Sequence, residues 1–542
     1  MAQRSNERRV AGRSRCRAAS ALVAGLLWLA AGCGGGGAGD GQPRAGSPAG
    51  YQALTSIDRL ALSNGRVAAV WSSSERRLVA LRERIYATHR PGVPVPELCR
   101  EVMFGYRRDG ASQWLRDVPV ADRGYLEGTG IAYTVQRTAG LRFETYAFAP
   151  YSPEIDGLVL LLRVVNEGPA VNDCALFLTA DLALGGNGDA TREWAFHDAT
   201  GGFLMEGRTG SGRRVLYRAL GGLDHWAIAR AGSADDARVL VQQGAHLPDR
   251  TWPFNADDVV CGLERQIAGG GRFATGDEAW WGVLIALRTD GDEQTLRATA
   301  AAFPAGLDPA GLLQRERDGW AQWHAGERMP AGLRADERAC FRQQTAFLRM
   351  GQAREIGPGN GQIVASLPPG KWNICWPRDA SYAIVALART GHLAEAQAAL
   401  RFLLQAGPGR YTNEVGRSYR ISVARYFGNG EEESDDNGNG PNIEFDNFGL
   451  VLWALGETIE HGGDLALVRG HWRVIRDEIA DVLVSLIAAN GLLRPDSSIW
   501  ERHLRPAPNT PDGARQFAYS SIMAVAGLER AADLALRVGD SA

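Results

Sequence analysis

The first half of the chain carries the hydrophobic pattern of β-strands. From Leu141 to Phe148, apolar and polar residues alternate with a period of two, as in a strand with one buried face. Leu158 to Val165 and Cys174 to Leu184 are apolar runs, and turn sequences such as Asn166-Glu167-Gly168-Pro169 separate the segments. Many strands with few helical stretches predict a large antiparallel sandwich over residues 51–288.

The pattern changes to a helical period after Thr289. Residues 289–333 are expected to form a helical linker, and residues 334–542 are helical throughout. Gly391 ends one predicted helix and Leu393 begins the next, which indicates a short helix hairpin. The predicted helices after the linker are 334–349, 380–390, 393–405, 445–460, 465–489 and 516–537. Helices in hairpin pairs suggest a toroid of paired helices, or part of one.

The amino terminus has the pattern of an export signal. Several arginines precede a short apolar segment, Ala18 to Ala31, which is shorter than a membrane span. Small residues then lead to Cys33, as in a bacterial lipoprotein signal, although Ala30 stands where Leu is usual. We expect a signal peptide over 1–33, a Gly/Pro-rich tether over 34–50 and lipidation of Cys33. The protein would then be exported to the cell envelope or periplasm; simple secretion and an uncleaved anchor are the alternatives.

Composition narrows the choice of partners and cofactors. The formal net charge of −3 does not favour nucleic acid, and membrane contact is expected only through the lipid anchor. Five cysteines follow Cys33 without a Cys-x-x-Cys spacing, and the histidines show no His-x-x-x-His, so the spacing predicts no metal site. Buried free thiols are favoured over a single disulfide.

Two short motifs carry the candidate chemistry. Trp500-Glu501 follows a turn, and Trp376-Pro377-Arg378-Asp379 lies about 120 residues upstream. An indole stacks on the apolar face of a pyranose, while Arg and Asp hold its hydroxyl groups. A glutamic acid in an apolar wall can keep its proton and donate it to a glycosidic oxygen. Both motifs also have structural interpretations. Glu501 could be a surface residue, Arg378 and Asp379 a helix-capping ion pair, and Trp376 an indole of the core.

Together the motifs resemble glycoside hydrolase family 15, which includes glucoamylases and glucodextranases. Asn360 to Ser366 before the first motif, and Tyr519 to Met523 after the second, fit the same resemblance. It implies a multidomain protein, with an N-terminal antiparallel β-supersandwich and an all-α (α/α)6 toroid joined by a helical linker. The resemblance extends from Tyr51 to the end of the chain.

The resemblance also implies roles for individual residues. Glu501 would be the general acid of an inverting, exo-acting hydrolase that releases glucose from the non-reducing ends of an α-glucan oligo- or polysaccharide. The implied substrate-binding residues are Trp376, Arg378, Asp379, Trp500 and, as a weaker candidate, Arg502. Arg502 is weaker because a cation directly after the acid opposes proton donation unless it points elsewhere.

The general base of the family is not found in this sequence. The family's base lies in the second half of the barrel, whereas this chain ends about 40 residues after Glu501. We therefore expect an incomplete toroid and question whether the chain is active as given. Two alternatives stay open: a phosphorolytic relative on the same barrel, and a non-catalytic carbohydrate-binding lipoprotein or remnant. The preference between α-1,4 and α-1,6 linkages also stays open.

An acidic, Gly-rich stretch from Glu431 to Gly440 precedes one predicted helix. Its oxygen atoms could hold Ca²⁺, but the spacing is not that of an EF-hand, and a solvated loop near the site is the simpler interpretation. Glu444 and Asp446 follow it and are explained by helix capping and by the helix dipole. The predicted hydrolysis requires no cofactor.

Overall fold

The computed structural model describes residues 58–540, apart from 139, 153, 252–256, 269–270, 304–305, 436–438 and 504–512. The predicted signal peptide, the tether and Cys33 therefore lie outside the described residues. Within the described residues, no helix is both long enough and apolar enough to cross a membrane.

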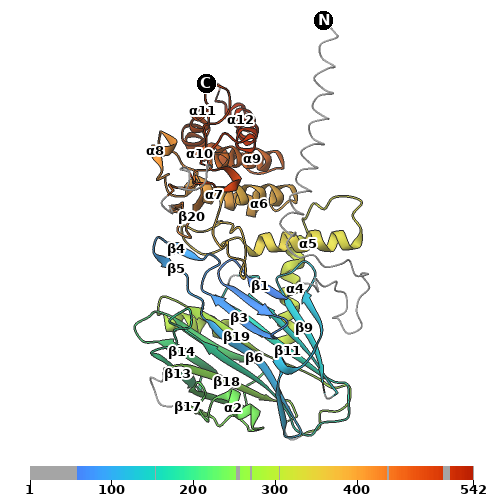
Figure 1. Cartoon of the computed structure of the whole chain (residues 1–542). Helices are drawn as coiled ribbons and strands as arrows, with labels where there is room; N and C mark the ends of the chain where they lie inside the picture. Colours follow the sequence, from blue (N-terminus) through green and yellow to red (C-terminus); the bar gives the residue numbers. More distant parts are fainter. Residues whose placement is uncertain are drawn as a thin grey trace. The chain divides into compact units, whose positions relative to one another are not determined.

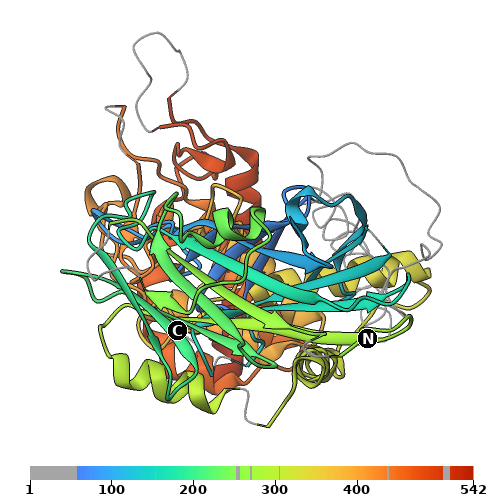
Figure 2. The same cartoon turned by 90° about the horizontal axis from the view of Figure 1, so that it is seen from below.

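Two β-sheets make up the first part of the described chain (Figures 1 and 2). In the described residues the first sheet has nine strands, eight of them in the order β1-β2-β3-β6-β12-β18-β16-β17, with β7 paired to β6. Neighbours are antiparallel except for β16 and β17. The bounds are β1 Arg59–Ser63, β2 Ala68–Ser72, β3 Arg77–Arg82, β6 Cys99–Arg108, β7 Ala111–Trp114, β12 Cys174–Leu182, β16 His225–Arg230, β17 Arg250–Thr251 and β18 Val259–Gln266.

The second sheet has eight strands in the order β13-β14-β15-β19-β11-β10-β9-β8, counted over the described residues. All of its neighbouring pairs are antiparallel. The bounds are β8 Val120–Tyr125, β9 Ala132–Thr138, β10 Leu141–Phe148, β11 Gly157–Asn166, β13 Glu193–Asp198, β14 Phe203–Arg208, β15 Arg214–Leu220 and β19 Glu278–Arg288. Strand β10 has the same bounds as the alternating segment of the sequence.

Strand β11 explains why one sequence segment is apolar throughout. Leu158, Leu160 and Leu162 belong to the core between the two sheets. Val159 and Leu161 point to the other side of the sheet, where they belong to a core shared with helices α3 (Glu293–Ala302) and α4 (Pro309–His324). Because successive side chains point to opposite faces, a strand covered on both sides needs apolar residues at every position.

Helices follow the sandwich (Figure 1). The linker helices are α3 Glu293–Ala302 and α4 Pro309–His324, and the helices after them are α5 Ala335–Met350, α6 Pro377–Arg389, α7 Leu393–Gln405, α9 Asp446–Glu460, α10 Leu465–Ile475, α11 Asp481–Ser485 and α12 Ala518–Val538. Smaller elements are α2 Ala237–Gln242, α8 Thr412–Val415, η1 Leu115–Asp117, η2 Arg476–Ala480, η3 Ser498–Trp500, β4 Thr88–Arg90, β5 Val93–Pro94, β20 Arg425–Tyr426 and β21 Glu432–Glu433.

The predicted helix over 465–489 is interrupted in the structure. Helix α10 ends at Ile475, a π-helical turn follows, and α11 ends at Ser485. The backbone N–H of Arg420 donates to the carbonyl oxygen of Glu478, and the guanidinium of Arg417 donates to the carbonyl of Asp481. These donors from outside the helix compete for its carbonyl groups, which is a recognised cause of π-turns and bends.

Helices α9 and α12 approach each other closely through two glycines. A Cβ atom on Gly449 of α9 would overlap the carbonyl oxygen of Met523 in α12, and one on Gly527 of α12 would overlap the carbonyl oxygen of Gly449. Helix α9 is buried on almost every side and also packs against α6. The glycine contact therefore fixes the position of the helix that leads into the candidate site.

Replacing Gly449 with alanine is expected to lower the free energy of unfolding by about 1–3 kcal/mol, because the added methyl group must push α12 away. Gly470 of α10 is a matched control, since a Cβ there meets no atom within 4 Å. Gly470→Ala should raise stability by about 0.5–1 kcal/mol through helix propensity. Urea unfolding of both variants measures the contrast; equal effects would contradict this account of the packing.

Candidate active site

The start of helix α6 places the first motif. Trp376 is the N-cap residue, and Pro377 occupies the first helical position, where its missing N–H costs no hydrogen bond. Arg378 and Asp379 follow in the first turn. Asp379 is thus not the N-cap residue, which corrects the capping interpretation of this pair. Its carboxylate lies 4.0 Å from Nε of Arg378, and 46% of its side chain is exposed.

Arg378 is the centre of the site. Its guanidinium donates a 2.6 Å hydrogen bond to Oε2 of Glu444, and the same nitrogen lies 3.7 Å from Oδ2 of Asp446. Its other terminal nitrogen lies 3.5 Å from Oε1 of Glu501. Burial lowers the pKa of Arg378, but the carboxylates of Glu444 and Asp446 outweigh it and raise this pKa above its ordinary value. The group is therefore a permanent cation that joins residues 123 positions apart in the sequence.

Glu444 and Asp446 have a different role from the one their sequence position suggests. The N-cap of α9 is Phe445, without a side-chain capping bond, so neither carboxyl caps the helix. Both are fully buried, and in the described part of the chain Oε1 of Glu444 and both carboxyl oxygens of Asp446 have no hydrogen-bond partner. Burial raises the pKa of both groups, and the charge of Asp446 raises the pKa of Glu444 further. One guanidinium cannot neutralise several adjacent carboxylates, so this cluster favours the protonated form of its acids more than water does.

Asp496 lies next to this cluster and holds in place the segment that leads to the second motif. Its Oδ2 accepts hydrogen bonds from the backbone N–H of Phe445 at 3.0 Å and from the hydroxyl of Ser520 at 2.9 Å. Burial, and next the charge of Asp446, raise the pKa of Asp496 to about 7. Asp496 therefore links the starts of α9 and α12 to the turn that carries Glu501.

Asp496 gives stability a defined pH dependence. Its folded-state pKa of about 7 lies above the ordinary value of 3.8. Between these values the folded state holds a proton that the unfolded state releases, so stability falls as pH rises, by roughly 1.4 kcal/mol per pH unit. Asp496→Asn keeps an acceptor for both donors and should reduce the measured slope by about this amount between about pH 4 and pH 7, while Glu444 and Asp446 still contribute.

Urea unfolding at pH 4.5, 6.0 and 7.5 measures the slope. Asp533 is an exposed residue of α12, and Asp533→Asn should keep the pH profile of the wild type. An unchanged slope in Asp496→Asn would show that another group carries the pH dependence.

The turn that holds Glu501 has an unusual backbone. Ser498 and Glu501 both have φ of 48°, in the left-handed region that residues with a Cβ rarely adopt. Such positions cost on the order of 1–3 kcal/mol and persist where the surrounding structure requires them. The side chain of Glu501 is 37% exposed, so it can reach solvent while it contacts Arg378.

The aromatic residues divide into buried and exposed indoles. Trp376 is 4% exposed and lies with its ring 5.2 Å from the guanidinium carbon of Arg425 and edge-on to Trp372 at 5.7 Å. Trp372 and Trp500 are 59% and 68% exposed. The exposed indoles able to stack on a sugar are thus Trp372, which the sequence did not single out, and Trp500, which it did.

The remaining predicted residues lie near the same turn. The backbone N–H of Arg502 donates to the carbonyl of Ser497, which closes the turn behind Glu501. In the acidic loop, Glu432 is buried and accepts from the hydroxyl of Tyr419, while Glu433 pairs with Arg425. These described carboxylates are already engaged within the protein, which gives no support to a calcium site there.

Sequence reasoning identified Arg378 and Glu501 but not the buried acids that hold Arg378. Asp446 and Glu444 were visible only as acidic residues at a helix start, which is a common position. In the sequence, Asp496 indicated only that it belongs to a turn. Charged residues that are fully buried can be identified only when the packing around them is known.

Comparisons with known proteins relate one segment of the chain to a family and the chain to a known fold. Residues 346–542 match the family model for glycosyl hydrolases family 15. The chain is similar in structure to a bacterial glucoamylase complexed with acarbose, at 12% identity and a TM-score of 0.60, over 92% of this chain and 66% of the glucoamylase. At this identity the likeness shows a shared fold, an antiparallel sandwich followed by helices.

Two further structures are more distant. One is a candidate kojibiose phosphorylase from the human microbiome, at 9% identity and a TM-score of 0.48, over 90% of this chain and 68% of that one. The other is a family GH92 inverting mannosidase from Bacteroides thetaiotaomicron, at 11% identity and a TM-score of 0.43. The match covers 91% of this chain and 63% of the mannosidase. These scores are too low to support an argument.

No curated protein sequence is significantly similar to this chain. The family match therefore rests on the helical segment and not on the sandwich. This segment contains the first turn of α6, the acids at the start of α9 and the turn of Glu501, which together form the site. The part of the chain that carries the candidate site is thus the part that matches the model of glycosyl hydrolases family 15, residues 346–542.

Proposed function

We propose that this chain acts on α-glucans as an inverting, exo-acting hydrolase, with Glu501 as the general acid. The observation that carries the proposal is the contact between Glu501 and Arg378, 3.5 Å apart, inside a family 15 segment. A partly exposed carboxyl beside a fixed guanidinium can meet the glycosidic oxygen of a sugar whose hydroxyl groups the guanidinium holds.

Each group has a defined task in the proposed reaction. Glu501 donates a proton to the leaving glycosidic oxygen while water attacks the anomeric carbon from the opposite face. Arg378 is positioned by Glu444 and Asp446, which are buried and cannot touch a sugar. Asp379, at the exposed edge of the same turn, is placed to accept hydrogen bonds from sugar hydroxyls.

A non-catalytic sugar-binding function is the second candidate. Of the acids around Arg378, Glu444 and Asp446 have 0% exposure and Asp496 is likewise buried, so none of these three can activate water for the attack. The chain spans 66% of the length of the bacterial glucoamylase that it resembles. Binding by Trp500, Trp372 and Arg378 without turnover would use the same surface.

One experiment distinguishes these functions. The purified chain is incubated with maltose, isomaltose or dextran, with and without phosphate, and the products are followed by ¹H NMR. Release of β-glucose supports inverting hydrolysis, and a glucose phosphate formed only with phosphate supports phosphorolysis. Maltose binding without any product supports the non-catalytic function, and failure to bind any of the sugars contradicts all three.

Export to the cell envelope, with a lipid anchor at Cys33, is proposed on the sequence pattern alone. Fractionation of cells expressing the full chain tests it, since an anchored protein sediments with membranes and detergent releases it. Recovery in the soluble cytoplasmic fraction would contradict both the anchor and the export.

A further inference from the structure

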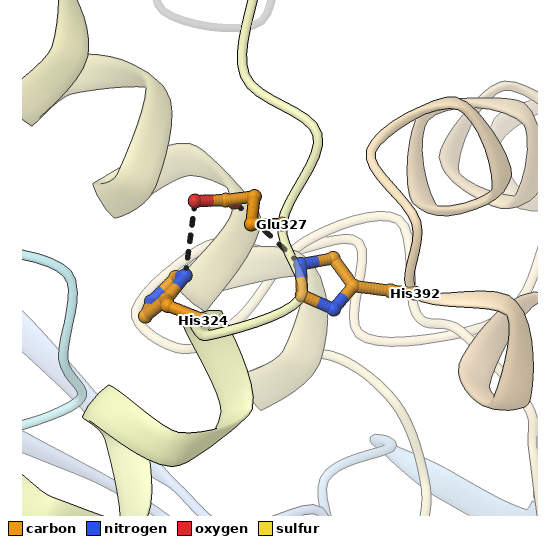
Figure 3. Close-up of side chains that lie close together, drawn as sticks. All are labelled: His324, Glu327 and His392. Atoms are coloured by element: carbon orange, nitrogen blue, oxygen red, sulfur yellow. Dashed lines mark ion pairs between the residues drawn. The ribbon is translucent and has the colours of Figure 1, made fainter.

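Three polar residues meet away from the candidate active site, between the linker and the helical segment. His324 is the last residue of α4, Glu327 lies just after it, and His392 is the N-cap residue of α7. Their side chains are 8%, 3% and 5% exposed. Figure 3 shows the carboxylate of Glu327 between the two imidazole rings.

Three of the four facing atoms of this cluster lack hydrogen bonds within the part of the chain that the structure describes. Nδ1 of His324 lies 3.3 Å from Oε2 of Glu327, and Nε2 of His392 lies 3.5 Å from Oε1 of Glu327. Nδ1 of His324, Oε2 of Glu327 and Nε2 of His392 are all buried without a hydrogen-bond partner among the described residues. Three such atoms that face one another would be costly unless something binds them together.

The tautomer of His324 shows that its contact with Glu327 is unfavourable when the ring is neutral. Its Nε2 lies 2.8 Å from the carbonyl oxygen of Gly128, which can only accept a hydrogen bond, so Nε2 carries a proton. In the neutral ring, Nδ1 then presents a lone pair to the carboxylate of Glu327. Two electron pairs at this distance repel, and either a second ring proton or a bound cation must lie between them.

The surroundings resemble those of a metal-binding histidine pair. Metal-binding histidines usually donate their second N–H to a carbonyl or carboxylate, as His324 does to Gly128. His392 stacks on Trp323 with ring centres 3.8 Å apart and planes 12° apart, which fixes its orientation. The hydroxyl of Thr345 donates to Oε1 of Glu327 at 2.7 Å.

The spacing also suits a tetrahedral ion. Zn²⁺ binds His nitrogen and carboxylate oxygen at about 2.0–2.1 Å, which places neighbouring ligand atoms roughly 3.3–3.4 Å apart in a tetrahedron. The nitrogen–oxygen distances of 3.3 Å for His324 and 3.5 Å for His392, each to a different oxygen of the Glu327 carboxylate, are close to this value. One ligand atom from each residue lies within 4.8 Å of the other two.

We propose that His324, Glu327 and His392 bind one divalent transition-metal ion of the Zn²⁺ class, which joins the end of α4 to the start of α7. Two imidazoles and one carboxylate are a common ligand set for such an ion, with a further position for water. The site would be structural, because it links two packed elements and is buried. It does not depend on the function proposed for Glu501.

A protonated His324 is the alternative that the experiment must exclude. In that state Nδ1 of His324 would donate to Oε2 of Glu327, 3.3 Å away, and no bound cation would be needed. Arg342 lies 3.9 Å from Oε2 of Glu327, and its half-exposed side chain can turn away when a cation binds.

The test is a metal titration of the full chain after treatment with a chelator. Isothermal titration with Zn²⁺ should show one strong site, and Zn²⁺ at about 100-fold above its Kd should raise Tm by at least ~3 °C. Co²⁺ in its place should give visible absorption bands typical of a four- or five-coordinate nitrogen and oxygen site. His392→Ala and the near-isosteric Glu327→Gln should each weaken Zn²⁺ binding at least 10-fold.

His471→Ala is the matched control, because this histidine lies on α10 and contacts Gln405 rather than a carboxylate. It should bind Zn²⁺ as the wild type does. A wild-type chain that binds neither Zn²⁺ nor Co²⁺ would overturn the proposal, and so would variants that retain full affinity. The wild-type titration decides the matter even if a variant does not fold.

Discussion

Glu501→Gln is expected to leave the fold and sugar binding intact and to slow hydrolysis of maltose by about 10²–10⁴-fold. The amide has nearly the same shape as the carboxyl. Its oxygen can still lie beside the guanidinium of Arg378, which is 3.5 Å from the carboxylate of Glu501 in the structure. It cannot donate a proton to the leaving oxygen. The left-handed backbone at this position, with φ of 48°, is not altered by the exchange.

The leaving group gives this prediction a sharper form. A 4-nitrophenyl glucoside needs little protonation on departure, so Glu501→Gln should slow its hydrolysis much less than that of maltose. A residue that only supports the fold would affect both substrates alike. Glu431→Gln, in the exposed part of the acidic loop, is the control and should keep full activity. Full activity of Glu501→Gln on maltose would exclude Glu501 as the acid.

Arg378→Met is expected to cost about 3–5 kcal/mol of stability at pH 8, because it leaves buried carboxyls without their counter-charge. Arg378 donates a 2.6 Å hydrogen bond to Glu444 and lies 3.7 Å from Asp446, and both acids have 0% exposure. Methionine fills most of the volume but supplies neither the charge nor the hydrogen bonds. Arg378→Lys should restore only part of the loss, since one ammonium cannot reach all of the partners.

The pH dependence separates this effect from simple loss of packing. Without Arg378, the folded-state pKa values of Glu444 and Asp446, already raised by burial, rise further. The folded state then holds protons that the unfolded state releases above about pH 4, so stability falls as pH rises. The loss relative to wild type should be clearly smaller at pH 5 than at pH 8.

Guanidinium unfolding of the full chain at both pH values measures this loss. Arg473→Met is the control, because that side chain is 90% exposed and its nearest acid is 3.7 Å away. It should change stability by less than about 0.5 kcal/mol at either pH. A loss in Arg378→Met that is equal at pH 5 and pH 8 would mean that the buried charges are not its cause.

Much of the secondary structure could be predicted from the sequence. The alternating segment Leu141–Phe148 is strand β10, and Leu393–Gln405 is helix α7, both with the predicted bounds. These predictions succeed because a strand or helix buried on one face repeats its apolar residues with the period of its own geometry. The predicted helix over 465–489 is helical as far as Ser485, but a π-turn after Ile475 divides it, where donors from Arg417 and Arg420, distant in sequence, bind its carbonyls.

The candidate site was predicted only in part. Arg378 and Glu501 are in contact, as the hypothesis required, whereas Trp376 is buried and the exposed indole beside it is Trp372. Whether an aromatic residue faces a core or a sugar depends on which elements cover it, and residue type alone does not decide this. The same holds for Glu444, whose partner lies 66 positions away.

By itself, the sequence determined the order of strands and helices, the hairpin at Gly391 and two motifs that suit sugar chemistry. These features are local, and short-range periodicity and residue chemistry encode them. Only the tertiary structure decided that Arg378 sits among buried acids and that His324, Glu327 and His392 face one another. The reason is physical: burial and charge pairing arise from helices that pack together across long separations in the chain, and no local pattern records them.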